Sequence, residues 1–303
     1  MPDLSDFPEV AIIVLNWNLP EDTLRCVTSL KASDYPAIRI LVVDNGSRPQ
    51  VVEQLETQLP ADVLLIKNSD NLGFAGGNNT GFKHALTLGS PYMLMLNNDT
   101  VVEPTMISKL VSAAEANPTV GVLGPIIYYL DEPDRVWFAG YRMPLGIYIL
   151  RRGLHLKPPL QPVEIVDFIS GCAMLIRRDV LEQIGGLSED YFMYYEDLDY
   201  CFRAKAAGIQ LGCVTDAKMW HAISSSTGGM HSPIKQYYNV KSSLLFYRRH
   251  SSGLRWFINV GLTLLRTSYS FVIALFQGRL TPQVMRMFLR GVREGWKPAP
   301  HVR

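Results

Sequence analysis

The chain has 303 residues, of which 48% are hydrophobic and 19% are charged, a composition that suits a globular protein of one large or two modest domains. Its four cysteines are widely spaced and form no CxxC pair, which argues against a disulfide framework or a zinc site and favours a reduced set. The net charge is +1, but ten lysines and arginines against one acid from residue 248 onward give that part +9 and leave −8 for residues 1–247. The acidic body argues against nucleic-acid binding, and the basic tail indicates an anionic partner.

Predicted strands and helices alternate along the first half of the chain. We expect buried strands at 10–18, 38–47, 62–68, 92–96 and 120–129, and helices at 21–33, 51–59, 76–89 and 103–118. This alternation predicts βαβ units and a mostly parallel sheet with helices on both faces. Residues 130–162 indicate irregular loops or a small antiparallel insertion, and residues 166–186 predict a strand followed by a helix.

Polar side chains follow three of these strands where each strand ends. They are Asn16 and Asn18, then Asp44 and Asn45, then Asn97, Asn98 and Asp99. Taken singly, Asp-Asn-Gly is a common turn and Asn-Asp-Thr is a common helix start. Because ligands of open α/β sheets bind outside the carboxyl ends of the strands, three such groups at equivalent positions predict one binding crevice.

The glycine patterns limit what this crevice binds. The first strand is not followed by GxGxxG, and the chain contains no GxxxxGK[ST], which argues against a dinucleotide fold and a P-loop. A nucleotide diphosphate would then need a divalent cation, and Asp99 is the best ligand candidate. Gly73, Gly76 and Gly77 would let the backbone approach a ligand closely, although a flexible loop and helix start explains them equally well.

Several motifs in order resemble one family over about Val10 to His250. They are "VLNWN", "LVVDNGS", "NLGFAGGNNTG", "LMLNNDT", "SGCAMLIRRDVLEQIGGLSEDYFMYYEDLDYCFRAKAAG" and the "WH" at Trp220 and His221. Together they resemble the family 2 glycosyltransferases with the GT-A fold, especially the bacterial rhamnosyltransferase-like branch. The resemblance implies an inverting transferase that moves a sugar, best L-rhamnose from dTDP-rhamnose, to a hydroxyl of a glycan or a lipid-linked acceptor.

The resemblance also implies domains and residue roles. A GT-A catalytic domain would span 1–247, with a nucleotide-binding part at 1–125 and an acceptor-binding part at 126–247, and a basic, apolar helical region would follow at 248–303. Nucleotide or donor binding falls to Asn16, Asn18, Asp44, Asn45, Gly73, Gly77, Asn78 and Asn98. Asp99 and His221 would bind Mg²⁺ or Mn²⁺, Asp197 would be the base beside Glu196, and Gly171, Cys172 and Tyr195 would meet the acceptor. Asn97 stands where the family has the first acid of its DxD motif.

Elementary chemistry supports the base, with ordinary alternatives beside it. Asp197 lies at a predicted helix start, where the helix dipole keeps a carboxylate ionised, but acidic capping gives the same pattern. One base opposite the leaving group suffices for single displacement and hence inversion. Alone, His221 would be interpreted as a structural histidine, Cys172 as a buried packing residue, and Tyr195 as part of an aromatic core.

The tail is apolar and basic. Residues 254–277 predict two hydrophobic helices with arginines between them, and the longest uncharged run, 267–278, is too short to span a bilayer. Contact with an anionic membrane surface is one interpretation, and packing on the catalytic domain or on a second copy is the other. Because no basic stretch followed by an apolar core opens the chain, we expect no signal peptide and a cytoplasmic enzyme, peripheral at the inner face of the membrane.

Two other functions remain open. A catalytically degenerate nucleotide-sugar-binding protein would bind donor without transfer, and Asn97 is the residue that favours it. A sugar nucleotidyltransferase would need a basic, glycine-rich loop after the first strand, and "NWNLPEDT" does not supply one.

Overall fold

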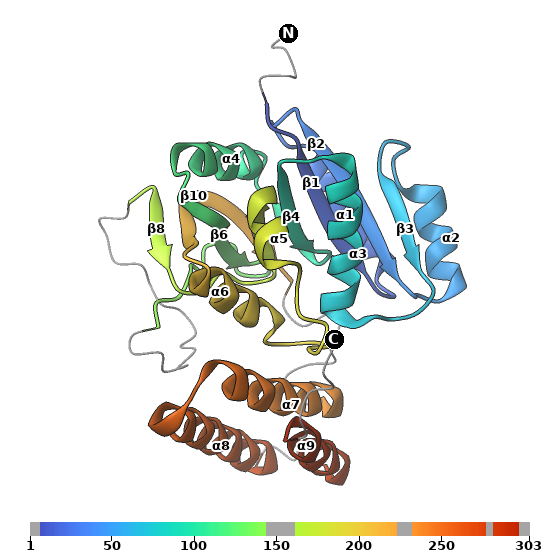
Figure 1. Ribbon diagram of the computed structural model, residues 1–303. Coiled ribbons are helices and arrows are strands. Elements are labelled where there is room, and N and C mark those ends of the chain that lie inside the picture. Colours follow the sequence, from blue (N-terminus) through green and yellow to red (C-terminus); the bar gives the residue numbers. More distant parts are fainter. Residues whose placement is uncertain (1–6, 144–160, 223–231, 277–280, 297–303) are drawn as a thin grey trace. The chain divides into compact units, whose positions relative to one another are not determined.

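The computed structural model describes residues 7–143, 161–222, 232–276 and 281–296 (Figure 1). The chain forms two compact units. The first, called here the α/β unit, comprises Met1–Arg142, Leu150–Glu189 and Asp197–Ile223. The second, called here the helical unit, comprises Met143–Ile149, Asp190–Glu196 and Ser224–Arg303.

Four parallel strands form the first half of the sheet in the α/β unit. β1 (Val10–Asn16) pairs with β2 (Ile38–Asn45) and β4 (Tyr92–Asn97), and β2 pairs with β3 (Leu64–Asn68). Helices α1 (Pro20–Lys31), α2 (Pro49–Gln58) and α3 (Gly73–Leu88) connect them (Figure 1). β1 and β4 are nearly continuous runs of buried apolar residues, as expected for strands covered on both faces. α3 ends at Gly89, whose φ of +82° suits a left-handed helix cap.

The second half of the sheet is mixed. β9 (Ala173–Arg177) lies antiparallel between β4 and β6 (Val120–Tyr129), and β10 (Gln210–His221) runs parallel to β6. The strand order is therefore β3-β2-β1-β4-β9-β6-β10-β5, where β5 is Thr100–Val102. Helices α4 (Met106–Ala116), α5 (Arg178–Ile184) and α6 (Glu196–Ala206) complete this unit. The architecture agrees with the predicted α/β class.

The region predicted as loops or an antiparallel insertion, residues 130–162, contains one short strand, and a second begins directly after it. β7 (Val136–Phe138) pairs antiparallel with β6, and β8 (Val163–Val166) pairs antiparallel with β10. Both extend the sheet beside its second half, which favours the antiparallel alternative. Residues 144–160 of the predicted insertion lie outside the described residues.

The helical unit contains α7 (Pro233–His250), α8 (Gly253–Phe276) and α9 (Pro282–Gly295). α7 and α9 pack closely where α9 has glycines. A Cβ at Gly291 would lie 2.5 Å from Val240 Cγ1 and one at Gly295 would lie 3.0 Å from the Lys241 carbonyl, so the missing side chains permit this approach. The prediction of two hydrophobic helices within 254–277 was wrong: α8 is one helix, since that stretch contains no proline to break it. Within the described part of the chain, no helix combines the length and hydropathy that a membrane crossing requires.

Candidate active site

A hydrogen-bonded carboxylate lies where β1 and β2 end. The Asn16 amide donates to Asp44 Oδ1 at 2.7 Å and to Ser47 Oγ at 3.2 Å, and the Ser47 N–H donates to Asp44 Oδ2 at 3.0 Å. The Thr23 hydroxyl donates to Asn16 Oδ1 at 2.9 Å. Asn16 and Asp44 are almost fully buried. Because its amide is engaged on both sides, Asn16 holds Asp44 in one orientation.

Asn45 ties the glycine segment to the same end of the sheet. Its amide nitrogen donates to Asn71 Oδ1 and to the Gly73 carbonyl, each at 3.0 Å, and its Oδ1 accepts the Leu72 N–H at 3.2 Å. Gly73 has φ +75°, in the region that favours glycine. The start of α3 is therefore anchored to β2 by one buried side chain.

Packing against the sheet accounts for Gly77. A Cβ at this position would lie 2.5 Å from Leu15 Cδ1 and 3.0 Å from Asn45 Nδ2, so the missing side chain lets α3 approach β1. Asn78, which follows it, is fully buried and donates to the Phe74 carbonyl at 2.9 Å. Asn18 has φ +57°; its N–H donates to Ser47 Oγ at 2.9 Å and its Oδ1 accepts the Arg48 N–H at 3.0 Å.

Asp99 and His221 form a buried pair. Register brings them together, because His221 at the end of β10 pairs with Thr100 of β5. His221 Nε2 lies 3.0 Å from Asp99 Oδ1. Burial lowers the pKa of His221, but the neighbouring Cys172 thiol and Asp99 carboxylate outweigh this effect and raise the pKa to about 10. Asn98, between Asn97 and this pair, donates to Thr23 Oγ1 at 3.0 Å.

Asp197 lies in the first turn of α6, where the sequence predicted a helix start. Its Oδ2 accepts the Gly171 N–H at 2.9 Å, and its Oδ1 accepts the Leu198 N–H at 2.8 Å. Burial raises the pKa of this carboxyl, and the backbone N–H donors offset only part of the rise. A Cβ at Gly171 would lie 3.0 Å from Asp197 Cβ, so glycine permits this close approach.

The segment Gly171–Cys172 joins these two groups. Gly171 binds the Asp197 carboxylate, and the next residue, Cys172, lies beside His221 and accepts the Asn97 N–H at its carbonyl at 2.9 Å. Burial raises the pKa of the Cys172 thiol; the neighbouring His221 lowers it, and the Asp99 and Asp197 carboxylates add smaller increases, so that the pKa stays raised. A buried carboxylate and a carboxylate–imidazole pair thus flank one short turn of chain before β9.

Two further predicted residues belong to the helical unit. Tyr195 lies within it, with its ring centroid 5.5 Å from that of Phe246. Tyr194 and Tyr195 both have positive φ, +67° and +71°, which is uncommon for bulky side chains. Glu196 is buried and immediately precedes Asp197 along the chain.

Sequence reasoning missed Asn79. Its Oδ1 accepts the Leu187 N–H and its amide nitrogen donates to the Leu187 carbonyl and to Glu189 Oε1, all at 2.9 Å. A Cβ at Gly186 would lie 2.3 Å from Asn79 Oδ1. Asn79 therefore fixes the chain that leads toward α6. Its one signal was a second asparagine on α3 where amphipathic packing alone would favour an apolar residue.

Thr23 and Trp137 were also missed. Thr23 links Asn16 to Asn98 through its hydroxyl. Its sequence position near the start of a predicted helix is one where threonine is common, so the residue type alone gave no signal of this link. The Trp137 ring centroid lies 4.9 Å from that of His221, edge-on, and comes from the region predicted as irregular. The antiparallel pairing of β7 with β6 brings this ring to the imidazole.

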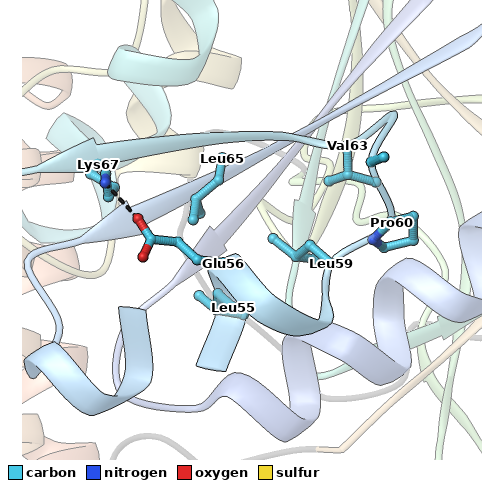
Figure 2. Close-up of a pocket in the computed structure, with 8 residues that line it drawn as sticks. Leu55, Glu56, Leu59, Pro60, Val63, Leu65 and Lys67 are labelled. Carbon is cyan, nitrogen blue, oxygen red and sulfur yellow. Dashed lines mark hydrogen bonds and ion pairs between the residues drawn. The ribbon is translucent and has the colours of Figure 1, made fainter. Parts of the chain in front are cut away.

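A pocket elsewhere in the α/β unit is separate from these residues. Figure 2 shows it between α2 and β3, with a Lys67–Glu56 ion pair at its rim. Leucine, proline and valine side chains make most of its lining, and it contains none of the predicted site residues. It is therefore not the candidate active site.

The Asp99–His221 pair has the donor chemistry for a divalent cation. Once the imidazole of His221, whose pKa is raised, has lost its proton, its nitrogen and the carboxylate oxygen of Asp99 can both bind Mn²⁺, and Mg²⁺ accepts the carboxylate. The described residues include no group of three or more histidine, cysteine, aspartate or glutamate side chains arranged around one metal position. A cation here would therefore draw its other ligands from diphosphate oxygens and water, as is usual at nucleotide sites.

Solved structures identify the class of fold. Mannosyltransferase PcManGT from Pyrobaculum calidifontis, in complex with GDP-Man and Mn²⁺, is 16% identical, and the match covers 98% of this chain and 89% of that one with a TM-score of 0.60. GalNAc-T7 with UDP, GalNAc and Mn²⁺ is 15% identical, with 79% and 48% coverage and a TM-score of 0.61. The mixed α/β unit has the GT-A fold of glycosyltransferases.

Sequence comparison gives the family. The family model "Glycosyl transferase family 2" matches residues 10–185, and this chain belongs to that family. Hexosyltransferase Agl10 of Haloferax volcanii, named for low-salt glycan biosynthesis, is 29% identical over 67% of this chain, which spans 64% of Agl10. N-acetylglucosaminyl-diphospho-decaprenol L-rhamnosyltransferase of Mycobacterium tuberculosis is 28% identical over 79% of this chain and 86% of its own length. The dTDP-rhamnosyl transferase RfbF of Shigella flexneri is 26% identical, with 78% and 79% coverage.

Proposed function

We propose that this protein transfers a sugar from a nucleotide diphosphate to an acceptor hydroxyl with inversion at the anomeric carbon. The observation that carries the proposal is the turn Gly171–Cys172, which holds the Asp197 carboxylate on one side and lies beside the Asp99–His221 pair on the other. One carboxylate held near a cation-binding pair is what a single displacement requires.

In the proposed step, Asp197 is the catalytic base. The acceptor oxygen attacks the anomeric carbon and forms the new glycosidic bond, its proton passes to Asp197, and the bond from that carbon to the diphosphate oxygen breaks. The electron pair leaves with the nucleoside diphosphate. The raised pKa of Asp197 makes the ionised carboxylate a stronger proton acceptor than that of an exposed aspartate.

Asp99 and His221 would hold a Mn²⁺ or Mg²⁺ ion, which when bound neutralises charge on the departing diphosphate. Asp44, held by Asn16 and Ser47, would accept hydrogen bonds from the nucleoside, with Asn18 beside it. Asn45 and Gly73 would shape this side of the site by anchoring α3. Gly77, Asn78 and Asn98 would lie behind them and hold the surrounding backbone and side chains in place.

The donor and acceptor are proposed from the relatives. Two of these relatives are named as rhamnosyltransferases, one with a dTDP-linked donor, and the name of the other includes a diphospho-decaprenol acceptor. We therefore propose dTDP-rhamnose as donor and a lipid-linked glycan hydroxyl as acceptor, with Gly171, Cys172 and Tyr195 on the acceptor side. A cytoplasmic protein at the inner face of the membrane would meet both.

A donor screen tests the proposal. Purified protein is incubated with dTDP-rhamnose, UDP-glucose, UDP-galactose or GDP-mannose, each with Mn²⁺ or Mg²⁺ and a short-chain prenyl-diphosphate-linked sugar. Release of nucleoside diphosphate together with a product of inverted anomeric configuration by NMR supports it.

The same screen separates a degenerate binder from an enzyme. The Asn97 position favours that second candidate, because it lacks the acid of the DxD motif. A thermal shift with one donor but no nucleoside diphosphate release, across all acceptors, would favour the binder and count against transfer.

A further inference from the structure

α8 presents an apolar face to solvent. Its inward face is mixed: beside the buried Val260 and Phe271 it contains Asn259, which donates to Ser251 Oγ at 3.1 Å, and the half-buried Thr263, whose hydroxyl lies 2.7 Å from the Tyr247 hydroxyl. Its solvent face instead shows large apolar side chains at a helical spacing, among them Leu254, Phe257, Leu265, Tyr269, Val272 and Phe276, which are 50–86% exposed. A helix of a water-soluble domain normally has the opposite arrangement, so this face is built for an apolar neighbour.

α9 lies against α8 and presents positive charge. Phe288 and Trp296 pack edge-on against Phe271 and Trp256 of α8, with ring centroids 4.9 and 5.7 Å apart. Arg286, Arg290 and Arg293 are exposed and spaced by four and three residues, so they form one stripe along α9. Glu294, which pairs with Arg290, is the one acid from residue 248 onward.

We propose that the exposed face of α8 lies on an anionic phospholipid surface, with the arginine stripe of α9 at the headgroups. Leucine, valine and phenylalanine side chains enter the acyl boundary, and guanidinium groups bind lipid phosphates as forked donors. This surface is independent of the donor sugar and of the base, so it goes beyond the proposed function and does not depend on it.

Charge favours lipid over a second copy of this chain. A two-fold contact through α8 and α9 would bring the same surface of each copy together, and on α9 that surface carries Arg286, Arg290 and Arg293 against the single acid Glu294. Like charges facing each other across an interface are unfavourable, whereas an anionic bilayer attracts each basic side chain near its surface. The apolar face of α8 and the arginine stripe of α9 therefore fit an anionic lipid surface better than they fit the same surface on a second copy of the chain.

Sedimentation with vesicles tests this surface. The full chain is mixed with vesicles of equal parts phosphatidylcholine and phosphatidylglycerol, and separately with phosphatidylcholine alone. We expect binding to the anionic vesicles, weakened by added salt because screening shortens the reach of the arginines. Leu254→Ser with Leu265→Ser should weaken binding about 100-fold, roughly tenfold per leucine.

Matched variants distinguish this face from general stickiness. Leu64→Ser with Leu88→Ser removes two leucines of the α/β unit that are 45% and 44% exposed, and should leave vesicle binding unchanged. Arg286→Gln with Arg293→Gln should cost on the order of fivefold per arginine at low salt. Circular dichroism confirms that each variant folds.

Three results would overturn the proposal: no sedimentation with anionic vesicles at low salt, equal losses in both leucine pairs, or a wild-type dimer by light scattering that the Leu254 and Leu265 changes make monomeric. The last would assign the face to a second copy of the chain.

A separate observation concerns the loop before the proposed base. Residues Asp190–Glu196 belong to the helical unit, where α7 holds them. Ser242 of α7 donates to the Met193 carbonyl at 2.9 Å, the Phe192 ring stacks on Tyr238 with centroids 4.9 Å apart, and Arg249 forms an ion pair with Asp190. These contacts, together with the packing of Tyr195 on Phe246, surround the two residues with positive φ, Tyr194 and Tyr195.

We infer that Ser242 is a positioning residue for Asp197. The chain passes from Tyr195 through Glu196 directly into Asp197, so the contact between α7 and Met193 holds the chain three residues before α6 begins. A shift of well under 1 Å at a base lowers the rate without weakening donor binding, because the base acts on the acceptor proton. This inference rests on the proposed role of Asp197.

Neighbouring serines supply the test. Ser243 donates to the Val240 carbonyl within α7 at 2.9 Å, so Ser243→Ala removes a local hydrogen bond and leaves the loop contact intact. We expect Ser242→Ala to lower kcat about tenfold with the donor KM unchanged, Ser242→Thr to restore most of it, and Ser243→Ala to behave as wild type.

Equal kcat values for the two alanine variants, or a loss in Ser242→Ala confined to the donor KM, would refute the positioning role. Absence of any turnover by the wild-type chain would instead refute the proposed function, so the two failures are distinguishable.

Discussion

Replacing Asp197 by asparagine removes the proposed base and leaves the volume of the side chain almost unchanged. Loss of a general base costs about 10²–10⁴ in rate, or ~3–5 kcal/mol of transition-state stabilisation at ~1.4 kcal/mol per tenfold. We expect kcat to fall by that factor and the donor KM to stay within about twofold. The measurement is steady-state release of nucleoside diphosphate with the donor and acceptor identified in the screen.

Stability should respond in two opposing ways. Both carboxylate oxygens accept backbone N–H groups, from Gly171 and Leu198, and asparagine offers one acceptor, so one buried N–H loses its partner at about 1–3 kcal/mol. The folded pKa of Asp197 is raised, so its contribution to stability is present below the unfolded pKa and is lost as pH rises through the folded pKa. Asparagine does not titrate and escapes this loss of stability, so above the folded pKa the two effects partly cancel.

The pH profile separates chemistry from folding. Only ionised Asp197 accepts the proton, so wild-type kcat should fall as pH drops through its raised pKa, above that of an ordinary aspartate, and Asp197→Asn should lose this acidic limb. Asp199→Asn is the matched control on the same helix, because Asp199 pairs with Arg203 at 2.9 Å and has no proposed catalytic role. It should lower the melting temperature yet keep the acidic limb. Near-normal kcat in Asp197→Asn would refute the assignment of the base.

Three further changes test the site from other sides. Gly77→Ala should destabilise the fold by ~1–3 kcal/mol through overpacking against Leu15 while the folded protein keeps its donor affinity, measured by denaturant unfolding and calorimetry; a selective loss of donor affinity would instead support contact of this glycine with the ligand. Asn79→Ala leaves the Leu187 N–H and carbonyl without their side-chain partner and should lower the unfolding free energy by ~2–4 kcal/mol; a change below 0.5 kcal/mol would contradict its anchoring role. His221→Ala should abolish the additional thermal shift that Mn²⁺ gives in the presence of nucleoside diphosphate, and retention of that shift would exclude His221 as a ligand.

Local patterns predicted the parallel half of the sheet well. Continuous apolar runs ending in polar residues marked β1, β2 and β4, and the C-cap glycine marked the end of α3 at Gly89. These features depend on neighbours within one strand or one helical turn, and such short-range preferences are readable from residue types. The same patterns brought Asn16 and Asp44 together, because adjacent parallel strands end at the same edge.

Long-range contacts were beyond that reasoning. Asn79 bonds to Leu187, 108 residues away, and no local periodicity marks an amide for such a partner. The antiparallel entry of β9 between β4 and β6 is another case, because strand order follows from tertiary packing. The two-helix prediction for residues 254–277 failed because arginines were interpreted as breaks, whereas an exposed position on a helix accommodates arginine at no cost in backbone geometry.

Asn97 is the residue where the sequence departs from the DxD pattern, and its surroundings suggest what the change does. Its backbone bonds to the Cys172 carbonyl through N–H and accepts the Thr100 hydroxyl at 2.7 Å, so position 97 has a structural role that any side chain fulfils. An acid here would add a third carboxylate to the region that already contains Asp99 and Asp197, and like charges raise each other's pKa. Asparagine removes that repulsion at the expense of a metal ligand. A site with this composition would favour a cation that arrives with the diphosphate, whose own charge replaces the missing carboxylate.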